Sequence, residues 1–160
     1  PLRRQRQMCI RDRGSFEGFC SGGGISRLAQ AMARKTLESG GSTLMCKTAE
    51  DIENITAKSA AEAAENGDET AKEVYRICGE KLGEGLAILA DILDPQAIII
   101  GSIFARSGHL LKNSMEKALH REALTQTAGC RIIPAGLGEK IGDLASLGIA
   151  LDAAANGGKA

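Results

Sequence analysis

Between residues 21 and 95, apolar side chains recur every three or four positions, which is the spacing of one face of an α-helix. The pattern predicts three helices, over residues 21–41, 48–67 and 68–95. Each begins at a residue whose side chain can cap the first turn and ends at glycine or proline. The capping residues are Ser21, Thr48 with Asp51, and Asp68. The third helix is the longest, and its apolar stripe predicts that Leu89 and Leu93 point inward.

After residue 95 the pattern changes from stripes to short apolar runs. Residues 97–101 read Ala-Ile-Ile-Ile-Gly, which predicts a strand buried on both faces, as in a parallel sheet. A helix is predicted over roughly residues 108–122, a second strand over 130–134, and a last helix from about Glu139. This order predicts the α/β fold class. Two strands make a poor sheet, so we expect part of the fold to lie outside this chain.

Composition narrows the class of protein. The 160 residues carry 20 basic and 20 acidic side chains, and this zero net charge argues against a dedicated nucleic-acid binder. The apolar share of 43% argues against disorder, and no apolar run approaches the length of a membrane span. Five cysteines without CxxC spacing indicate a reducing compartment, which predicts a cytoplasmic protein.

The two ends of the chain differ from its body. Residues 1–13 hold five arginines and one aspartate, whereas residues 14–160 carry a net charge of −4. The first segment is either a basic arm for nucleic acid or an extraneous or disordered leader, and we favour the leader. Residues 156–160 are predicted to be a frayed tail, which leaves 14–155 as the folded segment.

Glycine and alanine together make up 44 residues, so backbones must approach closely somewhere in the fold. Gly79 and Gly83 lie four residues apart on one face of the longest predicted helix, although each costs ~1 kcal/mol there relative to alanine. A neighbouring helix packed against that face is the favoured explanation, and a nucleotide base over the helix is the alternative. Gly148 is assigned the same packing role in the last helix.

Two places in the sequence have candidate chemistry. A glycine that leaves a buried parallel strand lets a ligand approach the backbone, and the helix start that follows favours anions. The residues at this place are Gly101, Ser102, Ser107 and Gly108. A tight turn without ligand explains them about equally well. Glu17, just before a helix and between Phe16 and Phe19, could accept hydrogen bonds from sugar hydroxyls, but on its own a solvated carboxylate is the favoured interpretation.

Taken together, several segments resemble the carboxyl-terminal part of the ROK family, which contains bacterial ATP-dependent sugar kinases of the glucokinase type and related repressors. The segments are Gly14-x-x-Glu17-x-x-x-Ser21-Gly22, IIIGS at 98–102, RIIPAGLG at 131–138 and GDLASLG at 142–148. The resemblance covers about residues 14–155. It implies the carboxyl-terminal part of an actin-like ATPase (ribonuclease H-like) fold, helix-rich in this segment and with few parallel strands.

The resemblance also implies roles for individual residues. Glu17 matches the glutamate of the family's GCxE motif, which binds the sugar. The family's adenosine site has Gly-Gly where this chain has Gly101-Ser102, and with Ser107 and Gly108 these residues are expected to contact ATP, accompanied by Mg²⁺. The cysteines of the family's zinc pattern fall on Met8, Ile10 and Ser15, so zinc is not expected.

The family's phosphate-binding DxGGT loop and catalytic aspartate precede the matched part, so no catalytic residue is expected in this chain. The first hypothesis is therefore that the chain is an inactive fragment of a sugar kinase. The intact kinase is expected to bind sugar and ATP, to contact no nucleic acid through this segment, to have no membrane segment and to be a homodimer. The second is a fragment of a sugar-responsive repressor with an upstream helix-turn-helix. The third is a helical interaction domain without ligand, which leaves the two strands unexplained.

Overall fold

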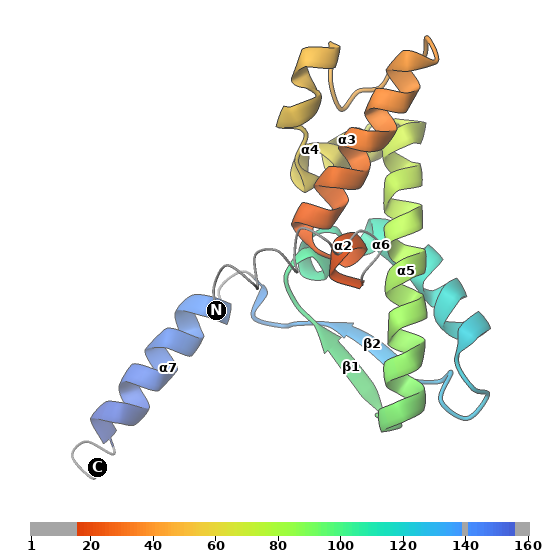
Figure 1. The fold of residues 1–160 in the computed structure, drawn as a ribbon. Coiled ribbons are helices and arrows are strands. Elements are labelled where there is room, and N and C mark those ends of the chain that lie inside the picture. Colours follow the sequence, from red (N-terminus) through yellow and green to blue (C-terminus); the bar gives the residue numbers. More distant parts are fainter. Residues whose placement is uncertain (1–15, 139–140, 156–160) are drawn as a thin grey trace, which may run out of the picture.

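The computed structural model describes residues 16–138 and 141–155, and Figure 1 shows a helical body above a small sheet. The predicted leader, 1–13, and tail, 156–160, lie outside the described residues. In chain order the elements are α2 (Phe16–Cys20), α3 (Gly22–Glu38), the 3-10 helix η1 (Ala49–Asn54), α4 (Ala57–Glu65), α5 (Glu69–Leu93), β1 (Ala97–Ile100), α6 (Ile103–Glu122), β2 (Arg131–Pro134) and α7 (Ile141–Ala155).

The long helix α5 is the centre of the body, with α2, α3 and α4 packed on it and α6 alongside it (Figure 1). Gly79 and Gly83 face α6, as the neighbouring-helix explanation predicts. A Cβ atom placed on Gly79 would lie 2.5 Å from the carbonyl oxygen of Leu111, and one on Gly83 would lie 2.7 Å from the Cβ of Ala118. The two glycines therefore allow the backbones of α5 and α6 to approach closely, and α6 covers the face that the alternative explanation gives to a nucleotide base.

The predicted caps are confirmed at the ends of two helices. The side chain of Ser21 accepts a hydrogen bond from the Gly24 amide at 3.0 Å, and Asp68 accepts one from the Ala71 amide at 2.9 Å. The single helix predicted over 48–67 is wrong in extent, because η1 ends at Asn54 and α4 begins separately after Thr56. Thr56 forms a second capping box of its own, which restarts the helix.

Asp68 also fixes the loop that precedes η1. Its carboxylate accepts hydrogen bonds from the Thr43 hydroxyl at 2.5 Å and from the Leu44 amide, in addition to the cap. Burial by itself would raise the pKa of Asp68, but these hydrogen bonds outweigh it and hold the pKa below its usual value. The charged form of Asp68 therefore joins residues 43–44 to the start of α5.

The cysteines behave as small buried or half-buried side chains. The four in the described residues are free thiols. Burial raises the pKa of Cys78 to about 12 and that of Cys20 to about 11, so both stay protonated at neutral pH. No disulfide joins the elements in the described part of the chain.

Strands β1 and β2 pair in parallel, with Ile98 opposite Ile132 and Ile99 opposite Ile133, as predicted. The prediction of burial on both faces is wrong, since Ile99 is 69% exposed. Side chains alternate between the faces of a strand, and the sheet described here has only two strands, packed on the body through Ile98 and Ile132. Among the residues that the structure describes, no element covers the opposite face, where Ile99 lies.

The end of α5 and the helix α7 also differ from the predicted packing. Leu89 and Leu93 are 42% and 67% exposed, so their predicted inward orientation is wrong in this chain. Helix α7 lies apart from the body in Figure 1, and its side chains at 142–154 are exposed. An added Cβ at Gly148 would meet no atom within 4 Å, so its assigned packing role is also wrong. Among the described residues, no helix has the length and apolar character needed to span a membrane.

Candidate functional site

A cavity of about 520 Å³ lies where the starts of α3 and α6 meet α4, which lines it from its first residue to its last. That volume lies within the range of small-molecule sites in proteins. It is lined by Gly22, Ser26, Thr56, Ala57, Lys58, Ala61, Glu62, Glu65, Ile103, Arg106 and Ser107. Three elements that are distant in sequence therefore contribute to one hollow.

The lining combines cationic, hydroxyl and apolar groups. Lys58 and Arg106 supply positive charge, Glu62 and Glu65 supply negative charge, and Lys58 Nζ lies 4.0 Å from Glu62 Oε1. The hydroxyl-bearing residues are Ser26, Thr56 and Ser107, and apolar surface comes from Ala57, Ala61 and Ile103. A ligand with an apolar ring and several polar or charged groups suits this combination, because the ring can lie on the apolar surface while its polar groups meet charged and hydroxyl side chains.

The structure moves the start of α6 relative to the sequence prediction. The helix begins at Ile103 and not near Gly108, so Ser107 and Gly108 lie inside it. Ser107 has a non-helical backbone (φ −123°, ψ 20°), and this kink separates the first turn from the rest of α6. Buried Ser107 lines the cavity, whereas Gly108 does not line it and faces the ring of Phe104. Of these two predicted ATP contacts, the structure brings only Ser107 to the cavity.

Gly101 and Ser102 form the tight turn between β1 and α6. The Phe104 amide donates to the Gly101 carbonyl at 3.2 Å, and Ser102 has φ 52° and ψ −124°. These angles are those of the first central position of a type II′ turn, where glycine is strongly preferred. Neither residue is among those lining the cavity, but together they set the direction of the first turn of α6, which does line it.

Replacing Ser102 with glycine is expected to stabilise the chain by about 1 kcal/mol, because glycine adopts this backbone conformation without strain. The measurement is the free energy of unfolding in urea. The matched control is Ser42→Gly in the loop before η1, outside the residues with positive φ, where glycine should give no gain. A loss of stability in Ser102→Gly would contradict the turn geometry described here.

Glu17 is exposed and lies within the short helix α2. The sequence prediction differs, because it places Glu17 just before a helix. Its carbonyl oxygen accepts from the Ser21 amide at 3.2 Å, and Phe16 beside it packs against Gly85 of α5. Glu17 does not line the cavity, but Gly22, five residues later, does. The α2–α3 junction therefore separates the candidate sugar carboxylate from the cavity.

Sequence reasoning missed the contribution of α4 to this site. Thr56 is the N-cap of the second capping box, Lys58 lies in the turn that the box begins, and the T-x-x-S pattern of Thr56 and Ser59 was the available signal for a helix start. Ser26 and Arg106 carried no signal of their own. Among the described residues, no group of three or more His, Cys, Asp or Glu could hold a metal ion.

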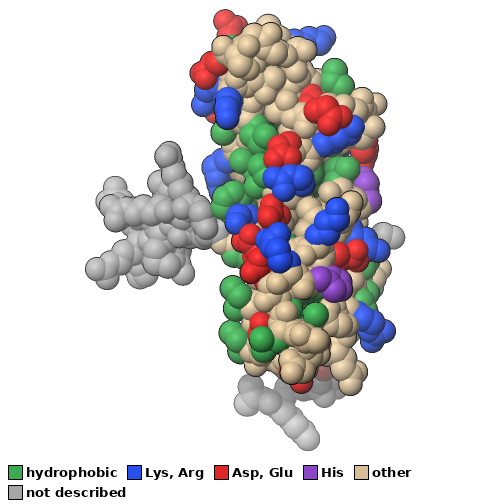
Figure 2. All heavy atoms as spheres, turned by 90° about the vertical axis from the view of Figure 1, so that its right-hand side faces the viewer, with side chains coloured by type: hydrophobic (Ala, Val, Ile, Leu, Met, Phe, Trp, Pro, Cys, Tyr) green, Lys and Arg blue, Asp and Glu red, His purple; other side chains and the backbone are tan. Residues whose placement is uncertain are grey.

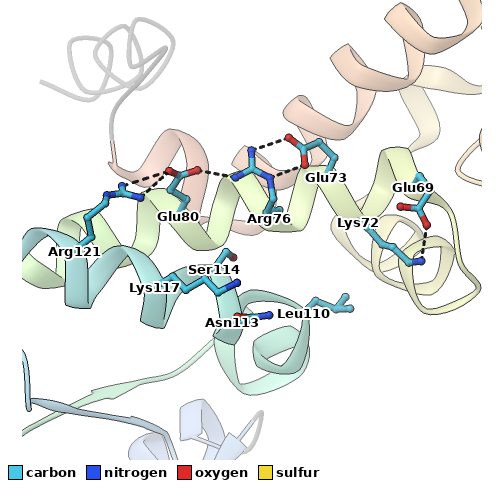
Figure 3. Close-up of a pocket in the computed structure, with 10 residues that line it drawn as sticks. All are labelled: Glu69, Lys72, Glu73, Arg76, Glu80, Leu110, Asn113, Ser114, Lys117 and Arg121. Carbon is cyan, nitrogen blue, oxygen red and sulfur yellow. Dashed lines mark hydrogen bonds and ion pairs between the residues drawn. The ribbon is translucent and has the colours of Figure 1, made fainter.

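A second hollow of similar volume runs between α5 and α6 and is lined mainly by charged side chains (Figure 3). Most of its charges are paired with one another. Arg76 bonds Glu73 at 2.6 Å and Glu80 at 2.9 Å, and these contacts hold the pKa of both carboxyl groups below their usual values. Basic and acidic side chains alternate along this face in Figure 2. The groove is therefore an ion-pair network on an exposed surface, where each pair contributes little to stability. Because most of its charged groups already have partners within the chain, we do not assign the ligand site to it.

The fold has close relatives among solved structures. The chain superposes on a ROK family glucokinase from Streptomyces griseus, solved in complex with glucose and AMPPNP, with a TM-score of 0.69 and 29% sequence identity. The match covers 81% of this chain and 42% of that one. The fold is therefore that of an actin-like ATPase segment, helix-rich and with a small parallel sheet, as the sequence predicts.

The sequence matches give the family. The model of the ROK family matches residues 4–152, and the chain belongs to this family. It is 31% identical over 108 residues to a glucokinase from Streptomyces coelicolor, and this alignment covers 68% of this chain and 34% of the relative. It is 30% identical over 73 residues to the DNA-binding transcriptional dual regulator NagC of Escherichia coli, which covers 46% of this chain and 18% of that relative. The matched part of the chain thus spans about a third of the length of the glucokinase and less than a fifth of that of NagC.

Proposed function

We propose that this chain is the carboxyl-terminal segment of a cytoplasmic, ATP-dependent sugar kinase, and that its cavity holds the adenosine part of the nucleotide. The observation that carries the proposal is that the starts of α3 and α6 meet α4 around one hollow of about 520 Å³. The relative from Streptomyces griseus was solved with glucose and AMPPNP, which supports a sugar and a nucleotide as the ligands.

The residues present fit an adenine nucleotide. Ala57, Ala61 and Ile103 offer apolar surface for the base. Lys58 and Arg106 share the lining with Glu62 and Glu65, and we propose that these two cations turn to the phosphates when the nucleotide binds. Ser107 supplies a hydroxyl at the kink of α6, and the turn at Gly101-Ser102 directs that helix toward the cavity. ATP would supply the transferred phosphoryl group, and Mg²⁺ would arrive with its phosphates.

Glu17 is proposed to hold the sugar. An exposed carboxylate accepts hydrogen bonds from hydroxyl groups, and bonds to a charged acceptor are stronger than those between neutral groups. Glu17 precedes the α2–α3 junction in the chain, whereas the cavity-lining residues of α3, Gly22 and Ser26, follow it. Phosphoryl transfer also needs a base for the sugar hydroxyl and a loop for the phosphates, and we propose that sequence outside this chain supplies both.

The kinase is favoured over the repressor by the extent of the matches. The glucokinase relative matches 68% of this chain, against 46% for NagC, whose name states that it binds DNA. A DxGGT loop in the sequence that accompanies this segment would support the kinase, whereas a helix-turn-helix would support the repressor. In either case the homodimer remains a prediction.

The proposal is tested by titrating the ¹⁵N-labelled chain with AMPPNP and following amide chemical shifts. We expect weak binding, with a Kd on the order of 1 mM, because one side of a two-lobed cleft forms only part of the contacts. The shifts should be largest at Ser26, Lys58 and Ser107. Lys58→Glu should weaken binding by repelling the phosphates, whereas the same charge change at exposed Lys47, outside the cavity, should not.

Shifts confined to the α5–α6 groove, or none at millimolar AMPPNP, would contradict the assignment of the cavity. Phosphorylation of a hexose by this chain alone would contradict the proposal that the base and the phosphate loop lie outside it.

A further inference from the structure

Tyr75 of α5 lies directly behind the cavity and is 1% exposed. Its hydroxyl donates a hydrogen bond to the carbonyl oxygen of Ala57, the first residue of α4, at 2.7 Å. The side chain of Ser107 at the kink of α6 lies beside the same hydroxyl, where it opposes the rise that burial causes in the pKa of Tyr75. One buried hydroxyl thus joins two walls of the cavity, since Ala57 and Ser107 both line it.

The Tyr75 hydroxyl and the Ser107 side chain are both buried, so water does not compete for their interactions. Ser107 is 6% exposed, and no buried side-chain nitrogen or oxygen in the described residues lacks a partner. A phenylalanine ring would fill the same space without the cost of burying a hydroxyl. The hydroxyl therefore contributes an interaction that apolar packing does not, which is to hold the α4 start and the α6 kink at a fixed separation.

A second contact joins the same two helices farther along. His109 Nε2 lies 2.8 Å from Glu65 Oε1, but both side chains are about half exposed, and ion pairs at the surface are screened by water and salt. The buried Tyr75 contact is therefore the stronger constraint on the distance between the two walls.

We propose that Tyr75 is a positioning residue for the nucleotide, acting through Ser107 and Ala57 to set the width of the cavity. The identity of the ligand rests on the function proposed above. Ligand groups must meet their partners to within about 0.5 Å, so freedom between the walls lowers affinity even where no ligand contact is removed.

The experiment compares AMPPNP binding to the chain and to three variants by the same amide-shift titration. Tyr75→Phe keeps the ring and is expected to raise the Kd about fivefold. Ser107→Ala should raise it to a similar extent, and the double variant should bind no more weakly than the weaker single variant, because both changes break one connection. The matched control is Thr127→Val, which removes a buried hydroxyl bonded to Asp91 away from the cavity and should leave the Kd unchanged.

The readouts separate this inference from the proposed function. If the parent chain binds AMPPNP and Tyr75→Phe binds it equally well, the positioning role is overturned while the nucleotide site stands. If the parent chain does not bind, the proposed function fails, and hydrogen exchange then decides whether Tyr75 couples the walls. Amides at Lys58, Ser59 and Ser107 should exchange several-fold faster in Tyr75→Phe than in Thr127→Val, and equal rates overturn the coupling. Should Tyr75→Phe not fold, Ser107→Ala tests the same connection by the same measurements.

Discussion

Replacing Gly83 with alanine should lower the free energy of unfolding by about 3 kcal/mol, which for a chain of this size corresponds to roughly 10 °C in Tm. Alanine would gain about 1 kcal/mol in helix propensity, so the loss must come from packing. The new Cβ would meet the Met115 carbonyl oxygen and would lie 2.7 Å from the Ala118 Cβ and 3.0 Å from the Leu119 nitrogen. Two of these atoms belong to the α6 backbone, so the helix itself must move.

Urea denaturation followed by circular dichroism measures this effect. The matched control is Gly23→Ala in α3, where the added Cβ would have only ordinary contacts, 3.5 Å or more from its neighbours. That variant should be neutral or slightly stabilised. A Gly83→Ala chain as stable as its parent would show that α5 and α6 do not approach at backbone distance.

Replacing Asp68 with asparagine should cost about 2 kcal/mol at pH 7. The amide of asparagine can still cap α5 through its oxygen, but its NH₂ group cannot accept a hydrogen bond from the Leu44 amide or from the Thr43 hydroxyl. At least one partly buried donor then loses its partner. Asp51→Asn, an exposed capping-box change in η1, is the matched control and should cost less.

The cost of Asp68→Asn should depend on pH in a defined direction. Because the folded-state pKa of Asp68 is lowered, its charged form contributes stability above the unfolded pKa, about 3.9, and this contribution is lost as pH falls through the lower folded value. The difference in unfolding free energy between parent and variant should therefore be constant from pH 5 to 7 and shrink below about pH 4. A difference that stays constant down to pH 2 would exclude the charge as its source.

The sequence predicts those parts of the fold that depend on local chemistry. Ser21 and Asp68 cap their helices as expected, because capping needs only a side-chain oxygen and the next three amides. The parallel strands follow from a continuous β-branched run. The role of Gly79 and Gly83 was predictable because glycine in a helix interior is costly unless something packs closely there.

The errors arise where the outcome depends on partners distant in sequence. Leu89 and Ile99 have the residue type of a core, but burial requires a covering element, and the described residues provide none over them. The sequence predicts a helix start near Gly108, whereas the structure continues the helix through a kink at Ser107, next to buried Tyr75. The α4 side of the cavity was missed for the same reason, since only folding brings Lys58 next to α6.

The short elements that line and flank the cavity have a consequence for how a ligand enters it. Helix α4 has nine residues and α2 has five, whereas α5 has 25 and α6 has 20. Helices this short are not stable alone, so α2 and α4 are ordered through their packing on α5. Their local opening costs less free energy than unfolding of the α5–α6 pair. Ligand exchange can therefore proceed by brief fraying of this side while the long helices stay folded, and a bound ligand would slow that fraying in return.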